Sequence, residues 1–241
     1  MKPQVHIAWG PQAVASASKE GKAIAIVDVL RFSSTVVTAI ANGFEIYPCE
    51  SPTKARQLEA RTGAVVSGKF GTAKFSLSPL NCLNPKETTE VILVSPNGAA
   101  CSTAADPEYS VFIGSFLNAR ATARALTNST NATNGVILVA AGEVAEDQFD
   151  DLQTRRFALE DYLGCGAILS QMRMPMTPEA EICKRAFEYS LQDYVQLIRE
   201  CESGKYLVER NQEADIVHCV QRDLYGVVPI ARGGKVIPFN S

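Results

Sequence analysis

The chain has 241 residues, of which 46% are hydrophobic and 20% are charged, and its net charge is −3 at neutral pH. This length allows one large domain or two small ones with buried cores. The small negative charge argues against a general nucleic-acid binder, whose surface would carry a basic stripe. No apolar run reaches the length of a bilayer span, and the start of the chain lacks the apolar segment of a secretory signal. We therefore expect a cytoplasmic protein that does not bind membranes.

Cysteine and histidine usage also limits the chemistry of the protein. The chain has seven cysteines and two histidines. No two cysteines have the Cys-x-x-Cys spacing of zinc or redox sites, so we expect reduced thiols that are partly buried. His6 lies in a short apolar run and is more typical of a strand residue than of a ligand, whereas His218 lies in a helical pattern and is more typical of a packing residue, so a zinc site built on histidines is not expected.

The first half of the chain alternates short apolar runs with amphipathic stretches. The predicted strands are residues 5–9, 23–28, 45–50, 64–68, 90–95, 110–115 and 135–141, and the predicted helices are 34–41, 52–60, 99–105 and 116–127. The strand-like runs are almost entirely apolar, which is typical of parallel strands covered on both faces. This half therefore predicts an α/β fold.

The second half is predicted to be mainly helical. Residues 155–172 indicate one helix, and residues 178–201 indicate a longer helix that Gly204 ends, with Ile182 and Tyr189 among its inward-facing residues. Residues 205–222 add more helix. The last predicted element is a hairpin that turns at Gly233-Gly234. No change of composition marks a boundary, so we expect a single domain over residues 1–241.

The first candidate site lies where the strand 23–28 gives way to a helix. Asp28 stands at the expected carboxyl end of the strand, where ligands bind in open α/β sheets. The helix begins near Ser33 or Ser34, and its first amides have no partners inside the helix, so they can bind an anion. Arg31 can grip a phosphate through two parallel hydrogen bonds, with Asp28 nearby to take a metal. The alternative is an ordinary serine cap and an Asp28–Arg31 ion pair.

A second turn has the same form, because the strand 90–95 is followed by Asn97-Gly98 and a run of small residues. The turn places an amide side chain at the strand end and lets a ligand approach the backbone closely. A plain turn is the alternative. Glu143, just past the strand 135–141, also stands where a strand-end ligand could lie, whereas the acidic run 143–151 as a whole is expected to be a solvated loop.

The third candidate site is Glu160 and Asp161, which lie in a segment that is apolar almost all round. Such a helix is buried. Buried carboxylates need a cation, strong hydrogen bonds or a proton, and Mg²⁺ suits one or two carboxylates with waters and phosphate oxygens. The alternatives are a salt bridge to Arg155 or Arg156, or partial exposure.

These segments, in this order, resemble the 2-phosphosulfolactate phosphatase family over essentially the whole chain. The matching segments are DVLRFSST (28–35), Asn97-Gly98, GSFLNARA (114–121), FALEDYLGCGAIL (157–169) and the tail 204–230. The resemblance implies a three-layer α/β/α fold with a mixed, mostly parallel sheet. It also implies Mg²⁺-dependent hydrolysis of 2-phospho-3-sulfolactate, a step toward coenzyme M, and a homodimer.

The chain departs from the family pattern at two positions that bear on the site. Gly68-Lys69 stands where the family usually has Gly-Glu, and Ser76 follows Phe75 where the family usually has an aspartate. Both departures remove an acidic residue. An alternative to the enzyme is therefore a non-catalytic protein that binds a phospho-metabolite and has lost turnover.

Residues and resemblance together predict a Mg²⁺-dependent phosphatase that acts on a small anionic phosphate monoester. The roles fall into three groups. The predicted catalytic residues are Asp28, Arg31, Ser34 and Asn97; the predicted substrate-binding residues are Ser33, Thr35, Gly98 and Lys69; the predicted metal ligands are Asp28, Glu160 and Asp161. The sequence leaves open whether water or a covalent intermediate carries the reaction.

Overall fold

The structure is a computed structural model that describes residues 2–84, 89–144 and 155–239. Its centre is one mixed sheet, with strands in the order β1-β7-β2-β6-β10-β11-β3-β5-β4. The strands are β1 (Val5–Trp9), β2 (Ala23–Val27), β3 (Glu45–Cys49), β4 (Val65–Val66), β5 (Glu90–Val94), β6 (Val111–Gly114), β7 (Val136–Ala140), β10 (Pro229–Arg232) and β11 (Lys235–Pro238). A separate short ribbon pairs β8 (Glu143–Val144) with β9 (Arg155–Arg156).

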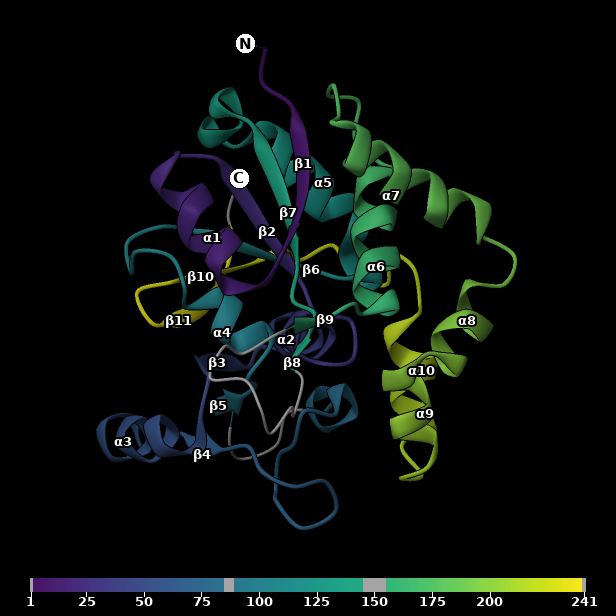
Figure 1. The fold of residues 1–241 in the computed structure, drawn as a ribbon. Helices are drawn as coiled ribbons and strands as arrows, with labels where there is room; N and C mark the ends of the chain where they lie inside the picture. Colours follow the sequence, from purple (N-terminus) through teal and green to yellow (C-terminus); the bar gives the residue numbers. More distant parts are fainter. Residues whose placement is uncertain (1, 85–88, 145–154, 240–241) are drawn as a thin grey trace, which may run out of the picture.

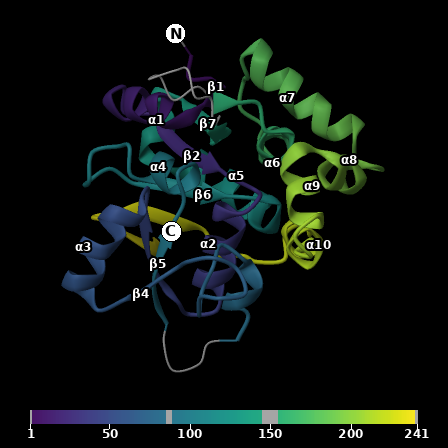
Figure 2. The same ribbon diagram turned by 60° about the horizontal axis from the view of Figure 1, so that its bottom comes forward.

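Helices cover both faces of this sheet, which confirms the predicted three-layer α/β/α fold (Figures 1 and 2). The helices are α1 (Gly10–Lys19), α2 (Phe32–Ala41), α3 (Pro52–Thr62), α4 (Gly98–Ser102), α5 (Ala119–Asn128), α6 (Leu159–Leu169), α7 (Pro178–Tyr189), α8 (Tyr194–Glu200), α9 (Glu202–Val208) and α10 (Glu213–Cys219). Short 3₁₀ turns are η1 (Pro79–Cys82), η2 (Phe116–Asn118) and η3 (Thr130–Asn134). Helix α1 was not among the predicted elements.

The sheet consists of two parallel blocks joined by an antiparallel hairpin. Strands β1, β7, β2 and β6 run parallel, as do β3, β5 and β4. The hairpin β10–β11, predicted across Gly233-Gly234, is inserted between the two blocks and pairs antiparallel with β6 and β3. Because β2 and β7 are parallel neighbours, their carboxyl ends lie side by side.

The core explains why the strand-like runs are continuously apolar. Ala25 and Val27 of β2 pack on the side of α5 and α6, whereas Ile24 and Ile26 pack on the side of α2 and α4. All four side chains are buried. A strand covered on both faces needs apolar residues at every position, as the sequence predicted.

Two predictions for the second half of the chain are wrong. The helix predicted over 178–201 is two helices, α7 and α8, because the chain turns at Ser190, whose hydroxyl and amide bond back to carbonyls of α7. As a result Ile182 is 58% and Tyr189 95% exposed instead of facing inward. The helix predicted over 155–172 is shorter, since Arg155 and Arg156 form β9.

Gly204 does not end a helix but lies inside α9, at the point where α9 contacts α8. A Cβ atom at Gly204 would be 2.0 Å from the carbonyl oxygen of Ile198 and 2.7 Å from that of Arg199. Both neighbours are backbone atoms, which cannot move aside without shifting the helix. Glycine is therefore required for the close contact of these two helices.

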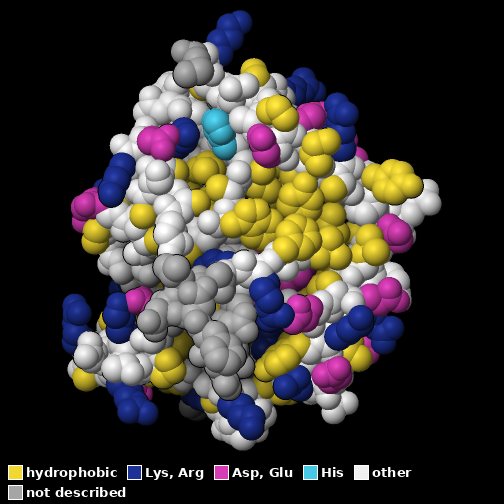
Figure 3. All heavy atoms as spheres, in the orientation of Figure 1, with side chains coloured by type: hydrophobic (Ala, Val, Ile, Leu, Met, Phe, Trp, Pro, Cys, Tyr) yellow, Lys and Arg dark blue, Asp and Glu magenta, His cyan; other side chains and the backbone are white. Residues whose placement is uncertain are grey.

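On the face seen in Figure 3, apolar side chains gather over the region of β1, α6 and α7. These elements carry Ile182, and Phe157 just before α6 is 61% exposed. The ring of Phe157 lies 5.3 Å from that of Trp9 and 5.5 Å from that of Tyr162. Patches of this kind are typical of interaction surfaces. The predicted homodimer stays a prediction.

The cysteines and histidines can be compared with what the sequence predicted. All seven cysteines are free thiols, and all but Cys201 are buried. His6 lies in β1, as expected of a strand residue, and the buried His218 in α10 bonds to the hydroxyl of Thr38, as expected of a packing residue. Across residues 2–84, 89–144 and 155–239, none of the helices has the length and apolar character needed to cross a bilayer.

Replacement of Gly204 by alanine tests the contact between α8 and α9. We expect the Gly204→Ala variant to lose about 2–3 kcal/mol of unfolding free energy, because overpacking against backbone atoms cannot relax. Urea unfolding followed by circular dichroism measures this change. Gly226→Ala is the matched control, since no atom lies within 4 Å of its added Cβ. A loss of less than about 0.5 kcal/mol at Gly204 would contradict the packing described.

Candidate active site

Asp28 follows β2 directly, at the carboxyl edge of the sheet, as predicted. The residue is 5% exposed. Its Oδ1 accepts a 3.0 Å hydrogen bond from the amide of Phe32, the first residue of α2. Its Oδ2 accepts a 2.7 Å hydrogen bond from the amide of Gly98, the first residue of α4. One carboxylate therefore ties together the two turns that follow β2 and β5.

Gly98 shows why this turn needs a residue without a side chain. A Cβ atom there would lie 2.6 Å from Oδ2 of Asp28 and 2.4 Å from Cδ1 of Phe32. The predicted approach of a ligand to the backbone of this turn stays a prediction, and the group that lies against the backbone in the structure is the carboxylate of Asp28. The predicted contact of Gly98 with substrate stays a prediction.

Asp161 makes a matching set of hydrogen bonds from the first turn of α6. It is 3% exposed. Its Oδ1 accepts a 2.8 Å hydrogen bond from the amide of Val29, and its Oδ2 accepts one of 3.0 Å from the amide of Gly142. Gly142 follows β7 and has a φ of +65°, a left-handed conformation that favours glycine. Asp161 thus ties α6 to the turns after β2 and β7.

Two further carboxylates, Glu143 and Glu160, belong to the same cluster. Burial first, and then the charges of Glu143 and Glu160, raise the pKa of Asp28 to about 7, although the hydrogen bonds from two amides act in the opposite direction. Burial, then the charges of Asp28 and Glu160, also holds the pKa of Asp161 well above its usual range. Burial raises the pKa of Glu143 as well, opposed by its hydrogen bond to Asn97. The four groups are close enough to repel one another.

Among the described residues, Asp28, Glu160 and Asp161 take part in none of the ion pairs, whereas the charges of Arg156 and Arg155 lower the pKa of Glu143. Asp28 does not pair with Arg31, and Glu160 and Asp161 do not pair with Arg155 or Arg156, so these alternatives are not what the structure shows. Glu160, which is 3% exposed, accepts a hydrogen bond from the thiol of Cys201. Like charges buried without a partner are costly unless a proton or a cation joins them.

The donor set fits a hard cation that keeps part of its water shell. Each carboxylate oxygen of Asp28 and Asp161 accepts one amide hydrogen bond, and a carboxylate oxygen has a second lone pair to offer. Within the described ranges, no group of three or more His, Cys, Asp or Glu side chains is arranged to hold a metal unaided. Mg²⁺ commonly binds one or two carboxylates and completes its shell with water and phosphate oxygens.

Arg31 precedes α2 and turns toward the C-terminal helices. Its Nη1 donates hydrogen bonds of 2.5 Å each to Oε1 of Gln212 and Oδ2 of Asp215. The buried thiol of Cys219 is affected by the charges of Asp215, Arg31 and Asp28 together, and burial raises its pKa to about 12. Arg31 therefore lies in the same region as the acidic cluster, paired with Asp215 and not with Asp28.

The three hydroxyl residues after Arg31 are fully buried and bonded within the protein. The Ser33 hydroxyl accepts from the amide of Asp28, Ser34 donates to the carbonyl of Val29, and Thr35 donates to the carbonyl of Leu77. Neither serine provides the side-chain cap of α2 that the alternative predicted. Their predicted roles toward substrate stay predictions, whereas their observed role is to shape the loop around Asp28.

Asn97 joins the cluster to Arg155. Its Oδ1 accepts hydrogen bonds of 3.2 Å from the amide of Val144 and from Nη1 of Arg155. Arg155 also donates to the carbonyls of Ala141 and Pro96, at 2.9 Å and 3.1 Å. It therefore holds the turn after β5 against the turn after β7, the two turns whose amides reach Asp28 and Asp161.

Lys69 lies apart from these contacts. It is exposed in the loop after β4, and its carbonyl accepts hydrogen bonds from the amides of Thr72 and Ala73. The structure does not bring its side chain to the acidic cluster through any hydrogen bond or ion pair within the described part of the chain. Ser76, the second departure from the family pattern, bonds to Asn81. Most of the acidic run 143–151 falls outside the described residues.

Sequence reasoning missed the partners of Arg31 and the bridging role of Arg155. Gln212 and Asp215 stand in the tail segment 204–230, which was matched to the family as a block without a role for any one residue. Asp215 is 1% exposed, and a buried aspartate on an amphipathic helix is a signal that it has a charged partner. Periodicity alone does not show which arginine that partner is.

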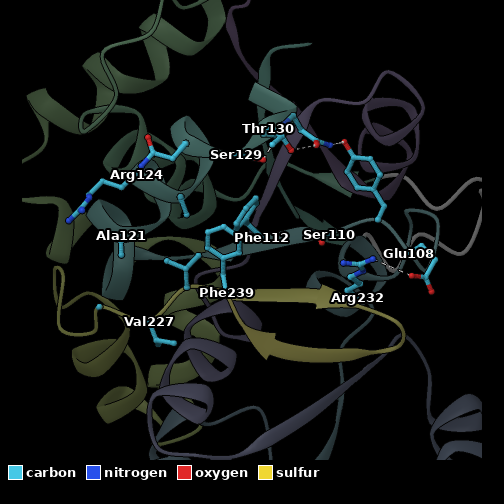
Figure 4. A pocket seen from close by; sticks show the side chains of 17 residues that line it. Glu108, Ser110, Phe112, Ala121, Arg124, Ser129, Thr130, Val227, Arg232 and Phe239 are labelled. Carbon is cyan, nitrogen blue, oxygen red and sulfur yellow. Dashed lines mark hydrogen bonds and ion pairs between the residues drawn. The ribbon is translucent and has the colours of Figure 1, made fainter. Parts of the chain in front are cut away.

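A cavity of about 910 Å³ lies elsewhere, at the amino-terminal ends of β2 and β6 (Figure 4). Phe112 and Phe239 point toward each other at its centre, with ring centroids 5.1 Å apart. Arg232 at its rim pairs with Glu108. Ligands of α/β sheets bind at the carboxyl ends of strands, where the acidic cluster is, so chemistry favours the cluster as the active site.

Comparison with known proteins shows to which family the chain belongs. A family model described as 2-phosphosulpholactate phosphatase matches residues 11–234. A relative in Pseudothermotoga lettingae, named a probable 2-phosphosulfolactate phosphatase, is 30% identical, with 85% of this chain and 87% of the relative covered. The 2-phosphosulfolactate phosphatase of Methanocaldococcus jannaschii is 27% identical, with 92% and 95% covered. A probable 2-phosphosulfolactate phosphatase of Carboxydothermus hydrogenoformans is 29% identical, with 94% and 92% covered.

The matched region contains the strand ends that carry Asp28 and Asn97, the helix that carries Asp161, and the tail that carries Asp215. The chain belongs to the 2-phosphosulfolactate phosphatase family, a family of phosphoric monoester hydrolases.

Proposed function

We propose that this protein is a Mg²⁺-dependent phosphatase that cleaves the phosphate ester of a small acidic metabolite, with 2-phospho-3-sulfolactate as its substrate. The substrate is the one for which the family and its relatives are named. The observation that carries the metal dependence is the buried cluster of four carboxylates at the carboxyl edge of the sheet. A doubly anionic phosphate group would not approach such a cluster unless a cation lay between them.

In this proposal one or two of Asp28, Asp161 and Glu160, the ligands predicted from sequence, hold the Mg²⁺ ion, and water and phosphate oxygens complete its shell. The ion, when bound, would neutralise charge on the phosphoryl oxygens and lower the pKa of a water molecule. The amide hydrogen bonds to Asp28 and Asp161 fix their carboxylates, so no reorganisation is needed when a ligand arrives. The carboxyl groups of the cluster affect the pKa of one another, so the protons that they bind belong to the cluster as a whole and not to one residue.

Arg31 is the residue proposed to bind the phosphoryl oxygens. Its guanidinium is fixed at one nitrogen by Asp215 and Gln212, so its remaining nitrogens are already oriented. A covalent intermediate on Ser33 or Ser34 is disfavoured, because both hydroxyls are fully buried and bonded to backbone groups. We therefore propose attack by water, with Asn97 as a residue that orients the substrate.

A screen for phosphate release tests the proposed reaction. Purified protein is incubated with 2-phospho-3-sulfolactate, 2-phospholactate and 3-phosphoglycerate, each with Mg²⁺ and with a chelator. We expect release that depends on Mg²⁺ and is fastest with phosphosulfolactate. Tight binding of these compounds without release from any of them would instead identify a binding protein that has lost turnover.

Replacement of the cluster carboxylates tests their role. Asp28→Asn and Glu160→Gln are expected to lower kcat by at least about a thousandfold, because each removes charge that holds the cation beside the phosphoryl group. Glu181→Gln is the matched control, since Glu181 pairs with Arg185 on the surface of α7. Circular dichroism shows whether each variant keeps the fold. Activity within about threefold of wild type in folded Asp28→Asn would refute the assignment.

The pH dependence of stability tests the electrostatics without any turnover. The pKa of Asp28 is about 7 in the folded protein and near 3.8 when unfolded. A raised pKa of this kind contributes stability that is complete below pH 4 and is lost as the pH rises through 7. We expect metal-free protein to lose on the order of 2 kcal/mol of unfolding free energy between pH 5 and pH 8. Urea unfolding in chelator measures the loss.

Two comparisons isolate the cluster in this experiment. Asp28→Asn should show a smaller loss than wild type over the same pH range, because it removes one titrating group and one charge that raises the pKa of Asp161. Mg²⁺ should restore stability to the wild-type protein at pH 8 more than at pH 5. Equal pH dependence in wild type and variant would contradict the account.

A further inference from the structure

We infer that Asp215 and Gln212 are positioning residues for Arg31. They orient its guanidinium so that its other nitrogens can bind an oxyanion. The inference about turnover rests on the proposed function. The inference about oxyanion binding does not, because it concerns the geometry of one guanidinium and can be tested with inorganic phosphate alone.

The contacts of Arg31 are confined to one edge of its guanidinium. Both hydrogen bonds to α10 involve Nη1, which has two N–H groups and donates one to Gln212 and one to Asp215. The side chain of Arg31 is 12% exposed and that of Asp215 is 2% exposed. An ion pair so little exposed keeps its geometry far better than a surface pair does.

The other edge of the guanidinium has no partner among the described residues. Neither Nε nor Nη2 of Arg31 donates a hydrogen bond there, and Thr122 Oγ1 is the one buried side-chain polar atom of the described chain left without a partner. Nε and Nη2 are therefore not buried. Together they form the planar pair of donors that binds carboxylate, phosphate or sulfonate through two parallel hydrogen bonds.

Asp215 is itself fixed from the opposite side. Its Oδ1 accepts a 2.5 Å hydrogen bond from the hydroxyl of Ser78, and its Oδ2 accepts from Arg31. A further hydrogen bond joins α10 to α2, since Nε2 of His218 in α10 lies 2.9 Å from Oγ1 of Thr38 in α2. Helix α10 is thus attached to α2 and to the segment before η1, and its carboxylate cannot follow Arg31 if the arginine swings away.

Asp215 has a second effect that opposes the first, and this makes the inference testable. Its negative charge close to Arg31 weakens the attraction of the site for an anion. If charge alone mattered, replacing Asp215 by asparagine would strengthen phosphate binding. If Asp215 acts by holding Arg31 in place, the same replacement weakens phosphate binding even though it removes a negative charge.

The experiment measures binding of inorganic phosphate by calorimetry, with Mg²⁺ present, for wild type, Asp215→Asn, Arg31→Ala and the double variant. We expect Asp215→Asn to raise Kd about tenfold, as loss of a hydrogen bond between charged groups does. In the Arg31→Ala background the same change should no longer weaken binding, because a positioning residue acts only through its partner and only the effect of the removed negative charge is left. Tighter or unchanged binding by Asp215→Asn, or a full effect without Arg31, would overturn the inference.

Two further variants keep the test decisive. Glu213→Gln is the matched control, because Glu213 lies on the same helix and pairs with Arg199 at the surface; its Kd should stay within about twofold of wild type. Gln212→Met removes the other contact of Nη1 without a change of charge, and should raise Kd about threefold even if Asp215→Asn fails to fold. An unchanged Kd in Gln212→Met would count against the inference.

Steady-state hydrolysis separates this inference from the proposed function. If the enzyme is active, Asp215→Asn should lower kcat/KM by at least as much as it weakens phosphate binding, because Arg31 acts on the transferring group. If no phospho-acid is hydrolysed but the phosphate-binding results hold, the proposed function fails and the inference stands.

Discussion

Two buried aspartates hold together the turns at the carboxyl edge of the sheet. Asp28 and Asp161 accept four backbone hydrogen bonds, from amides that belong to the turns after β2, β5 and β7. Backbone amides at such turns have no partner within regular structure, and each would cost free energy if buried alone. The carboxylates satisfy them and in doing so are fixed in position. The same contacts that complete the fold therefore assemble the acidic cluster.

This arrangement carries an electrostatic cost that a ligand can relieve. Burial raises the pKa of both aspartates, and their charges and those of Glu143 and Glu160 repel one another. A protein that kept four such groups only for structure would be more stable with neutral side chains in the same places. Sites that perform chemistry commonly keep groups of this kind because a cation or a reacting group offsets the cost. Arg31 does not offset it, since α10 holds its guanidinium toward Asp215.

The sequence allowed much of the fold to be predicted because its information is local. Apolar runs located seven strands of the main sheet, and their continuity indicated cover on both faces. The position of Asp28 after a strand was enough to place it at the ligand-binding edge. Helix α7 was predicted too long, because the apolar pattern continues past Ser190 although the backbone turns there.

What could not be predicted depends on contacts between distant parts of the chain. Arg31 and Asp215 are 184 positions apart, so the one protein partner considered for Arg31, as the alternative to a phosphate, was the nearer Asp28. The hydroxyls of residues 33–35 suggested substrate contacts, yet three-dimensional packing directs all of them to the protein itself. Glycine positions gave a similar ambiguity. Gly98 suggested a turn that a ligand can approach, but the sequence did not show that the carboxylate of Asp28 lies against it.

The central claim is that the acidic cluster is a cation site beside an oxyanion site. The most direct measurement is a crystal structure of the protein grown with Mn²⁺, which prefers the same oxygen ligands as Mg²⁺, and inorganic phosphate. The account predicts an anomalous difference peak in contact with Asp28 and at least one of Asp161 and Glu160, with a phosphate between that peak and Arg31. Manganese bound elsewhere, with these carboxylates bare and the phosphate remote from Arg31, would contradict it.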